Sequence, residues 1–304
     1  MPGGQAPCGL GWAPPTGGFV QPPDFSGEYI LGCSTKSLYY LENDTVQQTI
    51  DLSSWTYVGG MSGVNPSGAF LDIATNNGTV IVDVDSASSA FNSYTFESNG
   101  DLAGLFTPDG TRAYALIDGE YGSIAQVRVT DPSTRLTVAT IQLPQKGDCY
   151  ASATISPGGT RLYVADWCNR KVLVVDIDPS SSTYHTVLQQ IAVSGEARMI
   201  MFRPSGDYAY VTLDTGGVSV LATLATIPKF NTEIAYLSNV GSFNDIHTVD
   251  IALDGRFAYV AAGSANPNTL YVIDSDPLSA TFNTVVHTFA VGPQPYVVGV
   301  RPAQ

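Results

Sequence analysis

The sequence has few basic residues and no long apolar run, and each shortage excludes a class of protein. Only 13 Lys and Arg stand against 27 Asp and Glu in 304 residues, so the net charge is −14. A chain without Lys/Arg clusters cannot neutralise many phosphates, and we expect no nucleic-acid partner. The longest apolar runs are a handful of residues, far short of the ~20 that a membrane-spanning helix needs. We therefore expect no membrane span.

Motifs for several kinds of chemistry are also absent. The sequence contains no glycine-rich phosphate loop, no Gly-X-Ser-X-Gly nucleophile elbow and no Cys-X-X-Cys-His haem attachment. Residues 1–8 lack the basic and apolar regions of a signal peptide, which indicates either a cytosolic chain or a mature form without its leader. What the sequence does have is 30 Gly, 19 Pro and many Val, Thr, Ile and Tyr. This composition predicts an all-β protein.

An internal repeat is the strongest signal in the sequence. A Pro-X-Gly or similar turn precedes a Tyr-Val-like strand in each unit, and successive turn glycines are 41, 42, 49, 47 and 49 residues apart. These glycines are Gly27, Gly68, Gly110, Gly159, Gly206 and Gly255. Each unit contains four strand-like runs, the third of which usually stops at Asp, and a Phe-Asn-Ser/Thr element often precedes the fourth. Four short strands in ~40–50 residues describe a β-propeller blade.

The repeat phase predicts a six-bladed propeller of four-stranded antiparallel blades in residues 23–304, after a Gly/Pro-rich tail in residues 1–22. Tyr296–Val300 matches an innermost strand, and we expect it to close the ring by joining the first blade. The alternative is that Gly18–Val20 supplies that strand and the chain ends as a truncated seventh blade. The recurrent Tyr114, Tyr163, Tyr210 and Tyr259 are expected in the core.

Two repeat families resemble these units. The Pro-Asp/Ser-Gly…Tyr-Val-Ala…Val-Ile-Asp pattern, over most of residues 27–302, resembles the YVTN-type β-propeller repeats of secreted and surface bacterial and archaeal proteins. One blade, Leu162-Tyr-Val-Ala-Asp-Trp-Cys-Asn-Arg-Lys-Val172, is also similar to the NHL repeat. The resemblance implies a propeller, an extracellular, cell-surface or periplasmic location, and no particular activity.

The four cysteines fit this fold as disulfides. Cys149 precedes an innermost strand and Cys168 follows its neighbour, and the two share the antiparallel register of the hairpin around Gly158. Directly opposed strand residues are close enough for a disulfide. Cys8 and Cys33 remain to form a second bond. The alternative is four free thiols in a cytosolic protein.

Carboxylates recur where innermost strands begin, at the expected mouth of the central channel. They are Asp101, Asp148, Glu196 and Asp245. Converging oxygen ligands could bind Ca²⁺, and this placement is similar to that of the calcium-dependent six-bladed lactonases. His247, the one histidine assigned to an innermost strand, is the candidate general base. His185 and His287 are assigned to outermost strands.

Near the same mouth, the candidate ligand-binding residues are Tyr150, Trp167, Arg198 and Tyr296. Trp and Arg are typical binding anchors. The favoured function is a secreted or cell-surface, non-catalytic module for binding, structure or assembly, with a protein or glycan partner. The alternative is a Ca²⁺-dependent hydrolase of the lactonase or esterase type.

Overall fold

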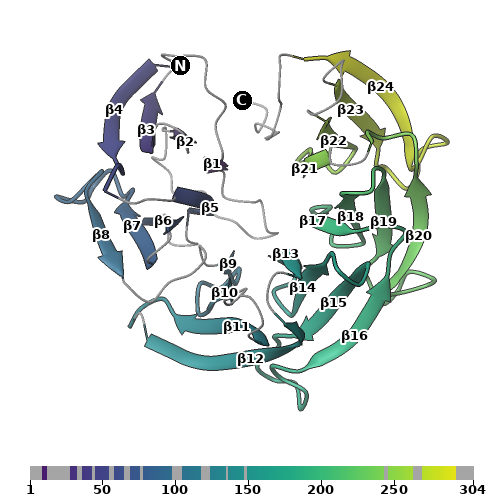
Figure 1. Cartoon of the computed structure of the whole chain (residues 1–304), viewed down its shortest axis with the longest axis horizontal. Coiled ribbons are helices and arrows are strands. Elements are labelled where there is room, and N and C mark those ends of the chain that lie inside the picture. The colour runs from purple at the N-terminus through teal and green to yellow at the C-terminus, as the bar shows by residue number, and fades with distance from the viewer. Residues whose placement is uncertain are drawn as a thin grey trace. The chain divides into compact units, whose positions relative to one another are not determined.

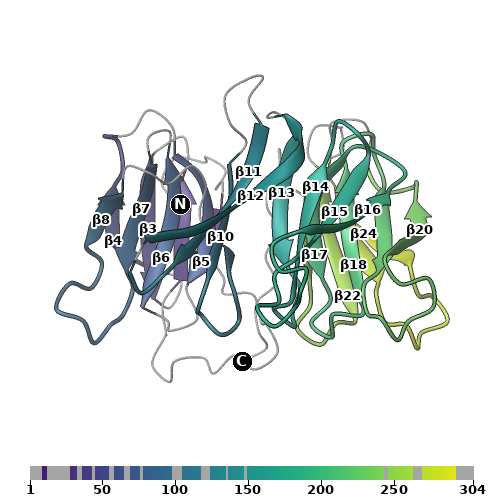
Figure 2. The ribbon, with the colours of Figure 1, turned by 90° about the horizontal axis from the view of Figure 1, so that it is seen from below.

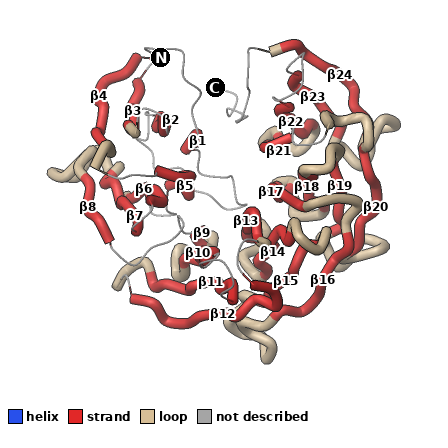
Figure 3. The backbone as a smooth tube through the Cα atoms, viewed as in Figure 1, coloured by secondary structure: helices blue, strands red, loops and turns tan. Residues whose placement is uncertain are grey.

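The computed structural model shows an all-β protein, and the strands and turns are the only regular elements in the parts of the chain that it describes (Figures 1 and 3). Those parts are residues 9–11, 28–32, 36–42, 45–54, 58–64, 69–75, 78–97, 105–117, 124–134, 136–146, 149–242, 246–262 and 269–291. Within them there is no helix with the length and apolar character needed to cross a membrane.

The strands form six four-stranded antiparallel sheets, each built from consecutive strands. The first contains β1 (Gly9–Gly11), β2 (Glu28–Gly32), β3 (Ser37–Glu42) and β4 (Thr45–Asp51). The second contains β5 (Val58–Val64), β6 (Phe70–Thr75), β7 (Gly78–Asp83) and β8 (Tyr94–Glu97). The third contains β9 (Leu105–Phe106), β10 (Ala113–Ile117), β11 (Ile124–Asp131) and β12 (Leu136–Lys146).

The fourth to sixth sheets follow the same plan. The fourth contains β13 (Tyr150–Ile155), β14 (Arg161–Asp166), β15 (Lys171–Asp176) and β16 (Val187–Ala192). The fifth contains β17 (Ala197–Phe202), β18 (Tyr208–Leu213), β19 (Val218–Ala222) and β20 (Thr232–Leu237). The sixth contains β21 (Ile246–Ile251), β22 (Phe257–Ala262), β23 (Thr269–Asp274) and β24 (Thr284–Ala290). The predicted blade count of six is confirmed.

The chain divides into two compact units. One comprises Met1–Ile117 with Gln126–Ile141, and the other Asp118–Ala125 with Gln142–Gln304. The first unit holds the first two sheets and most of the third, and the second unit holds the fourth to sixth sheets. The predicted boundary between residues 22 and 23 is not tested by this division and stays a prediction.

The first sheet differs from its predicted construction. β1 pairs with β2 through Gly9–Leu31, Leu10–Ile30 and Gly11–Tyr29. The strand beside β2 therefore comes from the N-terminal segment, and the prediction that Tyr296–Val300 takes this place is wrong. Gly-Leu-Gly has neither β-branched residues nor an alternating pattern, so its pairing with β2 leaves no signal in the sequence. Tyr296–Val300 and Gly18–Val20 lie outside the described residues.

The core lies between successive sheets. In the first unit, buried residues of β3 and β4 pack against those of β6 and β7. In the second unit, two clusters fill the spaces from the fourth to the fifth sheet and from the fifth to the sixth, and these sheets lie side by side in Figure 2. Every residue of β18 is buried, whereas β24 is mostly exposed. In the fourth and fifth sheets the two middle strands are thus more buried than the first and the last strand.

The recurrent glycine and asparagine of the repeat supply left-handed backbone conformations. Gly110, Gly159, Gly206 and Gly255 have φ between 67° and 71°, as the Pro-X-Gly turns predict. The Asn before the fourth strand also has positive φ, 60° at Asn92 and 58° at Asn283. Asn tolerates this region better than most residues because its short side chain bonds locally.

These asparagines link adjacent sheets. The buried Tyr163 of the fourth sheet donates a hydrogen bond from its hydroxyl to Asn231 Oδ1 of the fifth, at 2.8 Å. Tyr210 of the fifth sheet donates likewise to Asn283 Oδ1 of the sixth, at 2.7 Å. Burial raises the pKa of Tyr163 to about 12, so the hydroxyl keeps its proton at neutral pH. The predicted core position is thus confirmed for Tyr163 and Tyr210 and for the fully buried Tyr114, whereas Tyr259 is only half-buried.

The Asp that ends the third strand organises the next turn. Asp176 accepts hydrogen bonds from the hydroxyls of Ser181 and Thr183 and from the amide of Asp178, and it pairs with Arg161 at 2.6 Å. Burial raises the pKa of this carboxyl, but the hydrogen bonds and the guanidinium outweigh it and hold the pKa below its usual value. Asp274 has the equivalent Ser, Thr and amide donors and also a lowered pKa.

Removing the Tyr210 hydroxyl should weaken the link between the fifth and sixth sheets. Tyr210→Phe leaves Asn283 Oδ1 without its buried donor, which costs about 1–3 kcal/mol of unfolding free energy. Urea denaturation measures this change. Tyr184→Phe, at a half-buried tyrosine outside these links, is the matched control. Equal stability of the two variants would contradict the assigned role.

The lowered pKa values of Asp176 and Asp274 make stability fall in acid. Each folded-state pKa lies below the ordinary value of 3.8, so the stabilisation is complete above that pH and disappears as pH falls through the folded pKa. We expect Asp176→Asn/Asp274→Asn to lose less unfolding free energy than the wild type between pH 5 and about 2. Urea denaturation at each pH measures this loss. An equal loss of unfolding free energy in the wild type and the double variant would show that these two carboxyls do not contribute to the acid sensitivity.

Candidate functional site

The predicted disulfide between Cys149 and Cys168 is present. The two sulfur atoms are bonded and the Cα atoms lie 5.1 Å apart, joining the start of β13 to the end of β14. The predicted register holds from Ser152–Ala165 to Ile155–Leu162, but a bulge at Ala151 pairs Tyr150 with Asp166. The disulfide therefore lies outside the predicted register, one residue beyond the Tyr150–Asp166 pair on the β13 side and two residues beyond it on the β14 side. Cys8 and Cys33 lie outside the described residues, and their bond stays a prediction.

The loop after β14 holds an exposed tryptophan between two fixed ends. Asp166 is 1% exposed, and its carboxylate accepts hydrogen bonds from the amide and the side chain of Asn169. Burial raises the pKa of Asp166, and the bonds from Asn169 offset this only in part. On the other side, the Trp167 amide donates to the Cys149 carbonyl at 3.0 Å. The Trp167 side chain, between these anchors, is 38% exposed.

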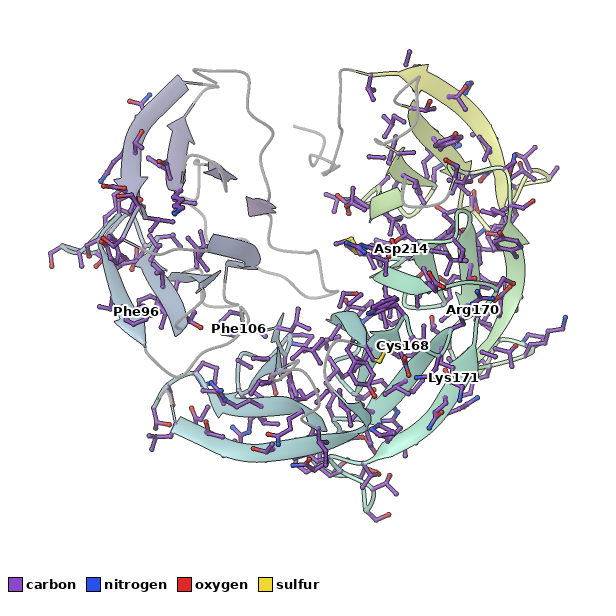
Figure 4. The ribbon with its side chains drawn as sticks, viewed as in Figure 1. Phe96, Phe106, Cys168, Arg170, Lys171 and Asp214 are labelled. Carbon is purple, nitrogen blue, oxygen red and sulfur yellow. A yellow bond between two sulfur atoms is a disulfide. The ribbon has the colours of Figure 1, made fainter. Side chains whose placement is uncertain are left out.

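One ion pair joins this loop to the fifth sheet, and a second lies within the fifth sheet. Arg170, which has φ of 53°, reaches Glu196 at 3.6 Å, and Arg198 in β17 reaches Asp214 at 2.7 Å. The amide of Asp214 also donates to the Glu196 carbonyl at 2.8 Å. Figure 4 labels Cys168 and Arg170, which lie in the turn between β14 and β15, and Asp214, which directly follows β18. We call the surface made by Trp167, Arg170, Glu196, Arg198 and Asp214 the Trp167 edge.

The Trp167 edge has an unusual pair of buried polar atoms. Asp214 uses Oδ2 to accept from Arg198, but within the described part of the chain its Oδ1 has no hydrogen-bond partner, and neither has the hydroxyl of the next residue, Thr215. A Cβ at position 195 would lie 1.9 Å from Thr215 Oγ1. Gly195 is therefore the residue that lets this hydroxyl lie against the backbone.

Three of the four predicted ligand-binding residues lie in the fourth and fifth sheets or their turns. Trp167 is in the turn after β14, and Arg198 is in β17, where its carbonyl accepts from the Ser152 hydroxyl of β13 at 2.7 Å. Tyr150 lies nearby at the start of β13, but its side chain is only 4% exposed. Tyr296 lies outside the described residues. The binding roles of these four residues stay predictions.

The predicted metal and catalytic residues are mostly beyond the described chain. Asp101, Asp148 and Asp245 lie outside it, and Glu196 is paired with Arg170. Among the residues with described side chains, no three or more His, Cys, Asp or Glu cluster as metal ligands would. The predicted Ca²⁺ site is therefore untested.

The histidines lie on three different elements. His247 lies in β21, and His287 lies in β24, as expected. The prediction that His185 belongs to an outermost strand is wrong, because it lies in the turn before β16 with φ of 63°. It occupies the repeat position that Asn231 and Asn283 occupy in the next two sheets.

Sequence reasoning missed Asp214 and Thr215. A usable signal exists, since Trp167 and Asp214 each stand four residues after the recurrent tyrosine, at Tyr163 and Tyr210. One repeat position thus supplies an aromatic ring in one sheet and a carboxylate in the next. The Arg170–Glu196 pair joins the fourth sheet to the fifth, and the Arg198–Asp214 pair joins the start of β17 to the turn after β18. No local sequence pattern indicates either pair.

Comparisons with known proteins support the fold. The LVIVD repeat family matches residues 59–94 and 247–288. A solved structure described as Kuenenia stuttgartiensis hydrazine synthase is similar at 17% identity and a TM-score of 0.71, covering 95% of this chain and 88% of that one. The fold is a six-bladed β-propeller. These repeats do not assign the chain specifically to the YVTN or the NHL type.

A second similar structure has no established function. It is a functionally unknown protein from Desulfotomaculum acetoxidans DSM 771, with 17% identity and a TM-score of 0.68, covering 89% of this chain and 83% of that one. No curated protein matches the sequence. At 17% identity, these two structures support the propeller fold and no statement about function.

Loss of the Cys149–Cys168 bond should destabilise the second unit. The two cysteines are 19 residues apart, and closing a loop of this size stabilises a protein by about 3 kcal/mol. We expect Cys149→Ala/Cys168→Ala to melt at a lower temperature than the wild type without reductant. An unchanged melting temperature would contradict this stabilisation, and Cys8→Ala/Cys33→Ala tests the other predicted bond separately.

Proposed function

We propose that this propeller is a secreted or cell-surface recognition module, without catalytic activity, that binds its partner through the Trp167 edge. The observation that supports this most is the exposed Trp167, held between a disulfide and a buried hydrogen-bonded Asp166. A tryptophan held exposed on a rigid scaffold loses little conformational freedom on binding, so more of its contact energy remains as affinity.

The neighbours of Trp167 also suit recognition. Arg170 and Arg198 have side chains that are 56% and 44% exposed, and each is oriented by one carboxylate. Tryptophan and arginine are the residues that most often dominate binding energy at protein surfaces. An arginine held by one carboxylate still has guanidinium N–H groups directed elsewhere, and these can bind a ligand.

The same geometry argues against acid–base chemistry at this edge. A general base must accept a proton from the substrate, whereas both carboxylate oxygens of Asp166 already accept from Asn169 and Glu196 is ion-paired with Arg170. Moving Glu196 or Asp214 away from its arginine would leave that half-exposed guanidinium without its carboxylate partner. The edge is therefore better suited to holding a ligand than to transforming it.

The extracellular location rests on the disulfide. Structural disulfides persist in secreted, surface and periplasmic proteins and are rare in most cytosolic ones. The Cys149–Cys168 bond lies beside the exposed loop that it fixes. A binding loop that depends on a disulfide requires an oxidising compartment.

A combined calcium and hydrolysis experiment tests this function against the hydrolase alternative. We expect the melting temperature to be the same in EDTA and in excess Ca²⁺, because a ligand stabilises only a protein whose native state binds it. We also expect no turnover of a panel of lactones and esters. A Ca²⁺-dependent rise in melting temperature together with hydrolysis would overturn the proposal, and metal analysis of the same sample gives the stoichiometry.

A further inference from the structure

The last strand of the sixth sheet forms an exposed edge. Within the described chain, β24 pairs with β23 on one side and with no strand on the other (Figure 1). The backbone N–H and C=O groups on that outer side can therefore bond to a further strand. Most side chains of β24 are exposed as well, and Phe289 is 53% exposed.

β24 lacks the residues that usually protect such an edge. Charged side chains and proline on an edge strand oppose its pairing with another chain. Four of the other last strands carry at least one of them: Asp51 in β4, Glu97 in β8, Pro144 and Lys146 in β12, and Glu233 in β20. β24, with the sequence Thr-Val-Val-His-Thr-Phe-Ala, contains neither.

The remaining last strand, β16, differs from β24 in another way. It has no charged residue either, but its two glutamines are engaged. Gln189 donates to the Asn231 carbonyl of the fifth sheet, and Gln190 accepts from Lys171. Among the described residues, no side chain of β24 bonds to another sheet. β24 is thus the least protected of the described edges.

The charge of the chain restricts how two copies can meet. Each copy has a net charge of −14, so two copies repel each other wherever carboxylates face carboxylates. Like charges directly opposite each other also destabilise a strand pair. β24 brings no carboxylate and no ammonium group to its edge, so two copies can pair there without either penalty.

β24 is also complementary to its own copy. When two identical strands pair antiparallel about a twofold axis, one residue lies opposite itself and its neighbours pair symmetrically. With Thr288 at the axis, His287 of each copy lies opposite Phe289 of the other. These two rings already share one face of β24, with centroids 6.2 Å apart. This register therefore joins four rings on one face and two threonines on the other, and both kinds of pair stabilise antiparallel strands.

We infer that β24 is a homodimer interface, in which it pairs antiparallel with β24 of a second copy about a twofold axis at Thr288. The contact is one strand wide and falls below the ~1,200 Å² of a standard interface, so the dimer is transient, with a Kd in the micromolar range. The inference goes beyond the proposed recognition function and does not depend on it. A dimer carries two Trp167 edges, which strengthens binding to a partner with repeated sites.

Sedimentation velocity of the full chain between ~1 and ~300 μM tests the interface. We expect the mass to rise from one chain to two with concentration. Phe289→Glu should keep the chain monomeric, because each copy then brings a carboxylate to the edge, and its melting temperature should not change at this exposed position. Leu188→Glu, at a 41% exposed position of β16, is the matched control and should dimerise like the wild type.

A cysteine at the axis tests the register. Directly opposed residues of antiparallel strands have Cα atoms ~4.5–5.5 Å apart, a distance that a disulfide bridges. Thr288→Cys should therefore form a covalently linked dimer on mild oxidation, visible on a non-reducing gel. Leu188→Cys at the same protein concentration should remain monomeric.

The outcomes are distinct from those for the recognition function. A chain that stays monomeric at ~300 μM, with no linked Thr288→Cys dimer, overturns the inference. A dimer that Phe289→Glu leaves intact also overturns it, because the interface then lies elsewhere. If Phe289→Glu disrupts the dimer but Thr288→Cys does not link it, β24 remains the interface and the register at Thr288 is overturned.

Discussion

The described structure depends on one constraint: each sheet must bury its apolar faces against the neighbouring sheets. Every residue of β18 is buried and every residue of β19 as well, so both faces of the fifth sheet need a neighbour. A single four-stranded unit has no second layer to cover it, which is why the repeat must recur along the chain. Apolar packing is not directional, whereas the Tyr163–Asn231 and Tyr210–Asn283 hydrogen bonds are. Each of them joins a tyrosine of one sheet to an asparagine of the next sheet whose backbone has positive φ.

The candidate site lies where this packing ends. At the ends of β14 and β18 the apolar strands give way to turns, and there the chain can expose Trp167 and the arginines without opening the core. The packed sheets hold the loops in place, and the loops carry the exposed side chains of the candidate site. The disulfide and the buried Asp166 transmit that rigidity to the tryptophan, so the loop behaves as part of the sheet.

The repeat made the strands of the fourth sheet and the Cys149–Cys168 bond predictable. Both depend on a hairpin register that the Pro157-Gly-Gly turn fixes locally. The prediction was still incomplete, because the bulge at Ala151 shifts the pairing of Tyr150 by one residue. The innermost strand of the first sheet was predicted wrongly, since β1 is three residues long and has no pattern of its own.

By itself, the sequence determined the all-β class, the six units, their turns and the recurrent tyrosine core. These features repeat, and each arises from residues within one unit, where spacing is visible along the chain. Only the tertiary structure decided that Arg170 meets Glu196, that Tyr210 meets Asn283, and that the atoms Asp214 Oδ1 and Thr215 Oγ1 are buried without a hydrogen-bond partner among the described residues. The first two contacts join residues 26 and 73 positions apart, and pairings over such separations are set by packing between sheets rather than by any local pattern.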